Sequence, residues 1–300
     1  MENSQPTPID RLKFSLIENA LDFLVAATEY GSGAEHLNWK YSVLNLVAGI
    51  ELLLKARLEV VHWSLLFSDV DKATESRLKS GDFVSADFTT VYTRLANIGS
   101  VRITDSDRKH LNDLRKLRHK IEHFTVDIEI DQIKSLLAKA LSFAVRFSET
   151  ELKNQISKGN RDTMSQIMER VKGFDEFVSE RMAVIQPHLK KANHLQECPR
   201  CWQETLDSFE GGRLRCHFCY YEISARELAE DKSESSIDTC PECGLEALGL
   251  AIYNNEEAGW HCYFCGQDFD TISHCSECGE AFEGEGPMCD SCWSHLLSKD

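Results

Sequence analysis

Apolar side chains recur every three or four positions along most of the first 193 residues, which is the spacing of one face of an α-helix. The helix over 37–68 is apolar on most of its circumference, so we expect it at the centre of the fold. The pattern as a whole indicates an all-α helical bundle. The spacing predicts helices over residues 9–30, 37–68, 105–124, 131–155 and 162–193.

Weaker patterns separate these helices. The stretch "YGSGAE" at residues 30–35 is expected to stop the first helix. Residues 69–104 are mixed and carry breaks at Gly81 and Gly99. Residues 125–130 alternate apolar and polar side chains, as an extended segment would. Almost no strand signal precedes residue 198.

Cysteine organises the remaining third of the chain. All twelve cysteines lie beyond residue 197 and form six Cys-x-x-Cys pairs, and successive couples of pairs enclose 14, 18 and 10 residues. The couples define three small modules, at residues 198–219, 240–265 and 275–292. The candidate metal ligands are Cys198, Cys201, Cys216, Cys219, Cys240, Cys243, Cys262, Cys265, Cys275, Cys278, Cys289 and Cys292.

A four-cysteine module suits structural zinc. Zn²⁺ prefers four tetrahedral thiolates, and one Cys-x-x-Cys turn supplies two of them. We therefore expect three structural Zn²⁺ ions in modules that resemble zinc ribbons, two short β-hairpins clasping one metal. Six redox dithiols are the alternative, but the βαβ context that they need is missing. His217, His261 and His274 lie beside ligand cysteines and are expected to be bystanders, because twelve cysteines fill twelve positions.

The net charge of −16 is unevenly distributed. Residues 1–197 carry 27 basic and 28 acidic side chains, whereas residues 198–300 carry 6 and 21. No Lys or Arg occurs from Cys240 to Ser298, and each zinc with four thiolates adds a charge of about −2. Modules two and three should therefore repel a phosphate backbone. We expect them to contact protein, through Trp260 and Trp293 if these are exposed, or merely to keep the chain soluble.

The first module differs from the other two because basic side chains balance its acids. If any module contacts RNA, we expect it to be this one. The residues concerned are Arg200, Arg213 and Arg215, together with Trp202, His217 and Phe218.

The amino-terminal stretch has no apolar segment behind a basic start, so no secretory signal is recognised. No apolar run approaches the roughly 18 residues that a membrane-spanning helix needs. Cysteines in metal-type pairs agree with a reducing compartment. We expect a cytoplasmic protein with no membrane contact.

The stretch "RKLRHKIEHF" at residues 115–124 concentrates charge on one predicted helix, with "DSD" at 105–107 as its expected N-cap. At 100° per residue, the core stripe falls within about 80°. This stripe consists of Leu114, Leu117, Ile121 and Phe124. The opposite face of the helix consists of Asn112, Arg115, His119 and His123. The ordinary interpretation is a solvated face with an Arg118–Glu122 ion pair. A metal pair of His119 and His123 is a second possibility, but it lacks a third ligand.

The stretch "LRKLRHKIEHF" resembles the signature of the HEPN family, an Arg followed after four to six residues by a His. Arg118 and His123 match that signature, with His119 as the polar residue after the Arg. The stretch "AGIELLLKARLE" at 48–59 resembles the family's central helix. The resemblance covers residues 9 to about 155. It implies a HEPN-like domain over 1–160, a helical linker over 161–197, and a homodimer that brings two motifs into one cleft.

The resemblance also implies metal-independent cleavage of RNA, in a toxin or defence role, with an antitoxin or other protein partner on the acidic modules. His123 would move a proton at the 2′-oxygen or the 5′-oxygen, helped by His119, and Arg118 would hold the scissile phosphate. Arg115, Lys116 and Lys120 would bind neighbouring phosphates. A non-catalytic dimeric adaptor is the alternative. It is favoured if the side chains of the basic cluster spread over solvent, and the nuclease is favoured if they converge with His123 in a dimer cleft. The cluster consists of Arg108, Lys109, Arg115, Lys116, Arg118 and Lys120.

Overall fold

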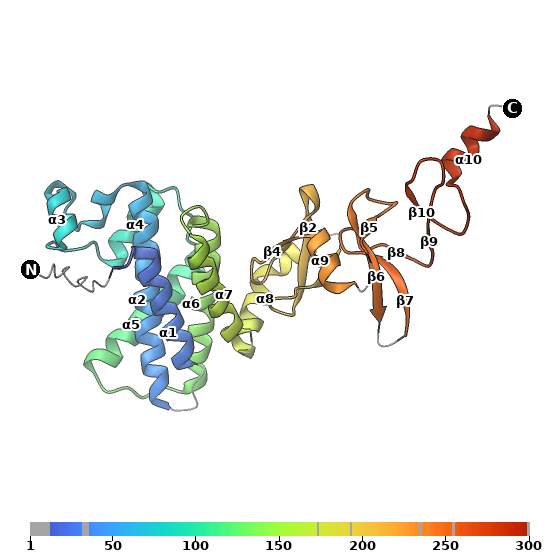
Figure 1. Cartoon of the computed structure of the whole chain (residues 1–300). Helices are drawn as coiled ribbons and strands as arrows, with labels where there is room; N and C mark the ends of the chain where they lie inside the picture. The colour runs from blue at the N-terminus through green and yellow to red at the C-terminus, as the bar shows by residue number, and fades with distance from the viewer. Residues whose placement is uncertain are drawn as a thin grey trace, which may run out of the picture. The chain divides into compact units, whose positions relative to one another are not determined.

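The chain divides into two compact units, Met1–Arg181 and Met182–Asp300. The structure is a computed structural model that describes residues 13–31, 36–172, 174–192, 194–233, 236–253 and 256–298. The first unit is helical, and the second contains small antiparallel sheets around the cysteines (Figure 1). An all-α amino-terminal part followed by small β modules is therefore confirmed.

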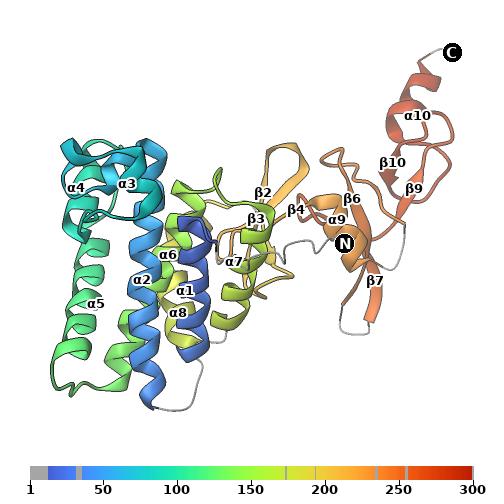
Figure 2. The same ribbon diagram turned by 60° about the vertical axis from the view of Figure 1, so that its left-hand side comes forward.

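Helix α2 is the centre of the first unit. It contacts α1, α4, α5 and α6, and Figure 2 shows α1 lying along it. Leu46, Ile50 and Leu53 of α2 are fully buried, which confirms the central position expected from its apolar circumference. The helices are α1 (Leu16–Gly31), α2 (His36–Val61), α3 (Glu75–Ser80), α4 (Phe88–Asn97), α5 (Asp105–His123), α6 (Ile130–Glu151), α7 (Lys158–Val171) and α8 (Asp175–Leu189).

Local capping moves the ends of the first two helices from their expected positions. The Ser15 hydroxyl accepts a hydrogen bond from the Glu18 N–H at 3.2 Å, so α1 begins at Leu16. Residues 9–12 of the expected helix lie outside the described residues. α2 ends at Val61, not at residue 68, because His62 is extended and its ring accepts from the Ser64 N–H to start a short 3₁₀ turn.

Helix α5 begins with a capping box at Thr104, not with the "DSD" cluster as N-cap. The Thr104 hydroxyl accepts from the Asp107 N–H at 3.1 Å, and the Asp107 carboxylate accepts from the Thr104 N–H at 3.3 Å. Asp105 and Asp107 remain in the first turn, where they face the positive helix end. The segment 125–129 that follows α5 joins no sheet, contrary to its alternating pattern.

The helix expected over 162–193 is two helices. Ser157 caps α7, and α8 starts at Asp175. α7 packs on α1, buries Ile167 and Val171, and is tied to α1 by an ion pair of 2.7 Å between Arg170 and Glu29. The expected domain end at residue 160 falls inside α7, so the helical unit continues to Arg181.

The second unit contains a structural repeat. Two four-stranded antiparallel sheets have the same order, and Leu206 pairs with Cys216 in the first as Leu248 pairs with Cys262 in the second. A two-stranded sheet and helix α10 (Asp290–Leu297) follow. The strands are β1 (Leu195–Glu197), β2 (Glu204–Phe209), β3 (Arg213–Cys216), β4 (Glu222–Ser224), β5 (Asp238–Thr239), β6 (Glu246–Tyr253), β7 (Glu256–Cys262), β8 (Asp268–Phe269), β9 (Ile272–His274) and β10 (Ala281–Glu283).

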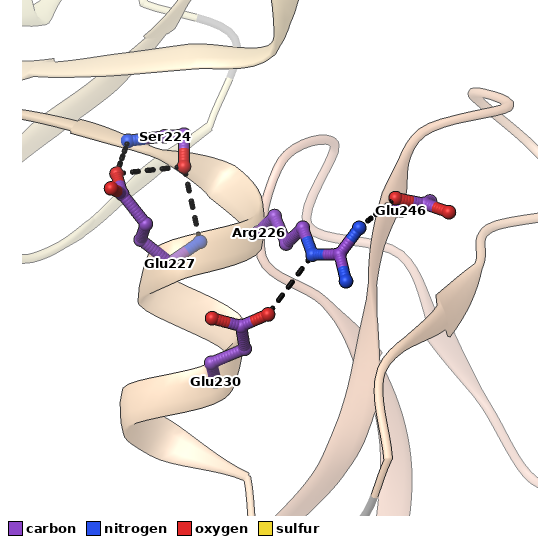
Figure 3. A network of polar contacts seen from close by, with 5 residues as sticks. All are labelled: Ser224, Arg226, Glu227, Glu230 and Glu246. Atoms are coloured by element: carbon purple, nitrogen blue, oxygen red, sulfur yellow. Dashed lines mark hydrogen bonds and ion pairs between the residues drawn. The ribbon is translucent and has the colours of Figure 1, made fainter.

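Helix α9 (Ala225–Lys232) connects the two larger sheets. It begins with a capping box between Ser224 and Glu227, with hydrogen bonds of 2.9 and 3.1 Å (Figure 3). Arg226 reaches from this helix to Glu230 in the next turn and to Glu246 at the start of β6. α9 also packs against β6, so the first two modules are joined by a folded element.

Candidate metal centres and the polar face of helix α5

The twelve cysteines gather into the three groups expected from their spacing. Within each group the four sulfur atoms lie within 4.8 Å of one another, and no cysteine forms a disulfide. The Sγ–Sγ distances of facing cysteines run from 3.6 to 3.9 Å. A tetrahedron of sulfurs at about 2.3 Å from a Zn²⁺ ion has edges of about 3.8 Å, so the geometry and the donor set both fit such an ion.

Each knuckle places two sulfurs together because its backbone reverses at the residue after the second cysteine. Gly244, Gly266 and Gly279 take a left-handed conformation at this position, with φ between 72° and 76°. Their N–H groups donate to the carbonyls of the first cysteines at 2.8–2.9 Å. Trp202 and Tyr220 take the same left-handed conformation in the first module, with φ of 58° and 59°.

The third module is not two hairpins. Its first pair, Cys275 and Cys278, forms a knuckle between β9 and β10. Its second pair lies at the start of α10, with Cys289 as the N-cap residue and Cys292 inside the first turn. The expectation of a zinc ribbon was therefore wrong for this module, because a helical turn also brings residues three positions apart to one side.

The surroundings of the sulfurs differ between modules. Burial alone would raise the pKa of Cys216, but hydrogen bonds from the other three thiols and from Thr205 lower it. Burial raises the pKa of the Cys243 thiol to about 11, so a metal must displace a proton there at neutral pH. Hydrogen bonds from the backbone N–H groups of Cys289 and Cys278 lower the pKa of Cys275 to about 6.

The three histidines beside the cysteines pair with carboxylates. His217 lies 3.0 Å from Asp207, and His261 lies 2.7 Å from Asp268. His274 lies 2.7 Å from Asp238. The four-ligand groups among the described residues contain cysteine alone, as expected for bystander histidines.

The expected RNA-contacting surface of the first module is only partly exposed. Trp202 is 64% exposed, but Phe218 is fully buried, so it packs in the core of the module and cannot contact a ligand. Arg213 and Arg215 both lie near Glu222, at 3.6 and 3.5 Å. In the second and third modules, Trp260 is half-buried and Trp293 is 55% exposed.

Helix α5 buries a shorter stripe than the periodicity predicts. Leu111, Leu114 and Leu117 are buried, whereas Ile121 is half-buried. Phe124 is 66% exposed, since the helix ends at His123 and the backbone at Phe124 turns to an extended conformation. The carboxy-terminal third of α5 therefore extends past the core, with most of its side chains accessible.

The polar residues of α5 surround an open depression. Its lining includes Arg115, Arg118 and His119, and its volume is about 450 Å³. Arg118 pairs with Glu122 at 3.0 Å, as the ordinary interpretation expects, and the ring centroids of His119 and His123 lie 4.8 Å apart. α5 runs unbroken from Asp105, so Arg118 and His123 diverge by about 140° on the same helix.

The basic cluster of α5 divides between two sides of the helix. Arg115 and Arg118 line the depression just described, whereas Lys109 and Lys120 line a second groove between α5 and α6. Lys116 lines both. The cluster does not converge with His123 within one chain. The α6 side of the groove, which includes Lys139, was missed because the half-buried residues of α6 could be assigned to a face only after α5 was placed.

Comparison with family models, with curated proteins and with solved structures found no match to this chain. Across the part of the chain that the structure describes, no helix is both long enough and apolar enough to cross a membrane. The fold and the sites thus define a helical unit followed by three four-cysteine modules, each able to hold a metal ion.

Proposed function

We propose that the helical unit is a metal-independent endoribonuclease of HEPN type and that the cysteine modules hold structural zinc. The observation that supports the nuclease most is the polar end of α5, where Arg118, His119 and His123 lie outside the core. Imidazole is the side chain that exchanges protons near neutral pH, and guanidinium binds phosphate through paired donors. Both chemistries that RNA cleavage needs are present on one helix end.

Cleavage would use the RNA's own 2′-hydroxyl as nucleophile. Attack of the 2′-oxygen on phosphorus forms the P–O2′ bond and breaks the P–O5′ bond, and a proton passes from the 2′-oxygen to the leaving 5′-oxygen. His123, helped by His119, would move this proton. Arg118 would leave Glu122 for the phosphate. An exposed ion pair is worth only about 0–1 kcal/mol, so this exchange costs little.

A dimer supplies what one chain cannot. Since Arg118 and His123 diverge on a regular helix, a phosphate held by Arg118 would meet His123 of the partner subunit in a shared cleft. The products would carry a 2′,3′-cyclic phosphate and a 5′-hydroxyl, and no metal takes part.

One observation favours the adaptor alternative. Helix α10 exposes Trp293, Leu296 and Leu297, three apolar side chains at helical spacing on an acidic module. Such a face suits contact with another protein. Under this alternative the helical unit would dimerise without cutting RNA.

The test is cleavage of total RNA and of tRNA by the purified full chain in excess EDTA. Wild type, Arg118→Ala and His123→Ala are compared in short incubations that leave the modules metallated, with His295→Ala as a matched control. His295 is an exposed histidine on α10 in the second unit and is not one of the residues of the proposed site. We expect wild type and control to cut alike, leaving cyclic phosphate ends, and the α5 variants to lose at least about a hundredfold in rate.

Equal cutting by all four proteins would reject the assignment of the site. No cutting by wild type on any RNA tested would favour the adaptor.

A further inference from the structure

The side chains of the groove between α5 and α6 take no part in moving the proton or in holding the scissile phosphate. It has a volume of about 730 Å³ and lies on the side of α5 away from Arg118. Four of the twelve residues that line it are lysines and two are aspartates, and Ser135 and Gln132 add hydrogen-bonding groups. The cations are Lys109, Lys116, Lys120 and Lys139, and the acids are Asp113 and Asp131.

The acids of the groove neutralise only one of its four lysines. Asp113 pairs with Lys116 at 3.5 Å, and Asp131 pairs at 3.5 Å with Lys134, which is not part of the lining. The other three lysines, Lys109, Lys120 and Lys139, have no ion pair with any residue that the structure describes. The groove therefore presents uncompensated positive charge on a unit that is otherwise close to neutral.

The lysines are arranged as a row. Lys109, Lys116 and Lys120 follow one another along α5 at separations of about 10.5 and 6 Å, because each helical residue advances the chain by about 1.5 Å. Lys139 lies opposite on α6. A row of this length suits a ligand with repeated negative charges, not a single anion. The groove holds about 730 Å³ in all, which limits it to a short stretch of one strand and is too small to enclose a duplex.

We propose that the α5–α6 groove binds the sugar–phosphate backbone of single-stranded RNA. This inference rests on the proposed function, because it takes RNA as the ligand. Lys116 lines both the groove and the depression that contains Arg118, so a strand held in the groove continues round α5 to the reacting face. Nucleic acid is favoured over an acidic peptide because the path ends at the face where Arg118 and His123 are proposed to act on a phosphodiester, which a peptide lacks.

The test separates binding from cutting. The full chain carrying His123→Ala is titrated against a fluorescein-labelled twelve-nucleotide oligouridine, and anisotropy is followed at several salt concentrations. Lys109→Gln and Lys139→Gln are then added together. A matched control adds Lys72→Gln and Lys79→Gln, two lysines that are 70% and 78% exposed and outside the groove. Glutamine keeps the length and helix propensity of the side chain without the charge.

We expect the groove variant to bind about tenfold more weakly, and its log–log salt slope to fall by about 1.4, since each contact to a single strand contributes about 0.7. The control should stay within about twofold of its parent. Unchanged affinity and slope in the groove variant overturn the proposal. Weaker binding of a glutamate twelve-mer by the groove variant, with oligouridine binding unchanged, also overturns it and makes the groove an acidic-peptide site.

The nuclease proposal is judged independently. If wild type fails to cut RNA but the groove variant loses oligouridine affinity, the groove assignment stands and the nuclease assignment fails. If wild type cuts and the groove variant binds normally, the reverse holds.

Discussion

At the knuckles, single residues with a side chain adopt a left-handed backbone conformation that normally favours glycine. The position after the second cysteine is left-handed in five of the six pairs. Gly244, Gly266 and Gly279 accept this conformation freely, whereas a side chain there costs about 1–2 kcal/mol. Trp202 and Tyr220 adopt the left-handed conformation despite this cost, because their N–H groups donate to the carbonyls of Cys198 and Cys216 and thereby stabilise the turn.

The second module allows a matched prediction at this position. A Cβ atom on Gly244 meets nothing within 4 Å, whereas one on Gly266 would lie 2.3–2.5 Å from the ring of His194. Gly244→Ala should therefore lower the free energy of unfolding by about 1 kcal/mol, through backbone strain alone. Gly266→Ala should lower it by about 2–4 kcal/mol, because overpacking against the ring is added. Chemical denaturation followed by tryptophan fluorescence measures both.

Removing the His194 ring tests whether it causes the additional loss of stability in Gly266→Ala. His194→Ala combined with Gly266→Ala should recover at least about 1 kcal/mol relative to the sum of the single changes. The same combination with Gly244→Ala should be additive. Equal losses in the two glycine variants would show that His194 does not lie against Gly266.

At the scale of elements, α1 and α2 pack closely around Gly49. A Cβ atom on Gly49 of α2 would lie 2.8 Å from Leu24 Cδ2 and 3.0 Å from the Ala20 carbonyl oxygen of α1. The backbone oxygen cannot move without displacing its helix. Gly49 is thus required by the approach of the two helices, although glycine weakens a helix interior.

We predict that Gly49→Ala lowers the free energy of unfolding by about 1–2 kcal/mol, because the clash exceeds the gain in helix propensity. Thermal unfolding followed by circular dichroism measures the change. The control is Gly159→Ala in α7, where a Cβ atom meets nothing within 4 Å. This control should raise stability by up to about 1 kcal/mol. A stabilising Gly49→Ala would contradict the α1–α2 packing.

Elements also decide which side of α5 each charge occupies. The helix is regular, so its faces follow from the sequence, but α6 turns one of them into a groove and leaves the other open. The face away from α6 still contacts α4, since the guanidinium of Arg115 lies 4.7 Å from the centre of the Phe88 ring. A residue assigned to phosphate binding is therefore also held in place by a neighbouring helix.

Across the whole molecule, the four-sulfur groups become more exposed along the chain. All four ligands of the first module are buried, and two of the four in the second. In the third module Cys275 alone is buried and Cys278 is exposed. A chelator reaches exposed ligands without local unfolding, so metal should leave the third module first and the first module last.

We predict that a chromophoric chelator releases three zinc ions per chain in distinct phases, the fastest at least about tenfold ahead of the slowest. Cys278→Ser should remove the fast phase and leave the slow one. Cys201→Ser, in the buried first module, should remove the slow phase. Stopped-flow absorbance measures the amplitudes. Loss of the slow phase in Cys278→Ser would contradict the order.

The sequence by itself determined the membership of the three metal groups and the helical character of the first unit. Both follow from short-range rules, since a Cys-x-x-Cys turn joins two sulfurs locally and apolar periodicity assigns the faces of a helix. Gly81, named as a break, is the left-handed residue that ends α3. The periodicity did not predict that α1 begins at Leu16 or that α2 ends at Val61, because capping side chains determine both positions.

Only the tertiary structure decided what lies against each face. Phe124 and Phe218 are both apolar, yet the first is exposed where α5 extends past the core and the second is buried, although it belongs to the knuckle of Cys216 and Cys219. The helix that carries Cys289 also follows from packing, because its Cys-x-x-Cys spacing fits a knuckle and a helical turn equally. Periodicity specifies a direction around a helix. The neighbouring elements, often distant in sequence, specify whether that direction meets protein, a groove or solvent.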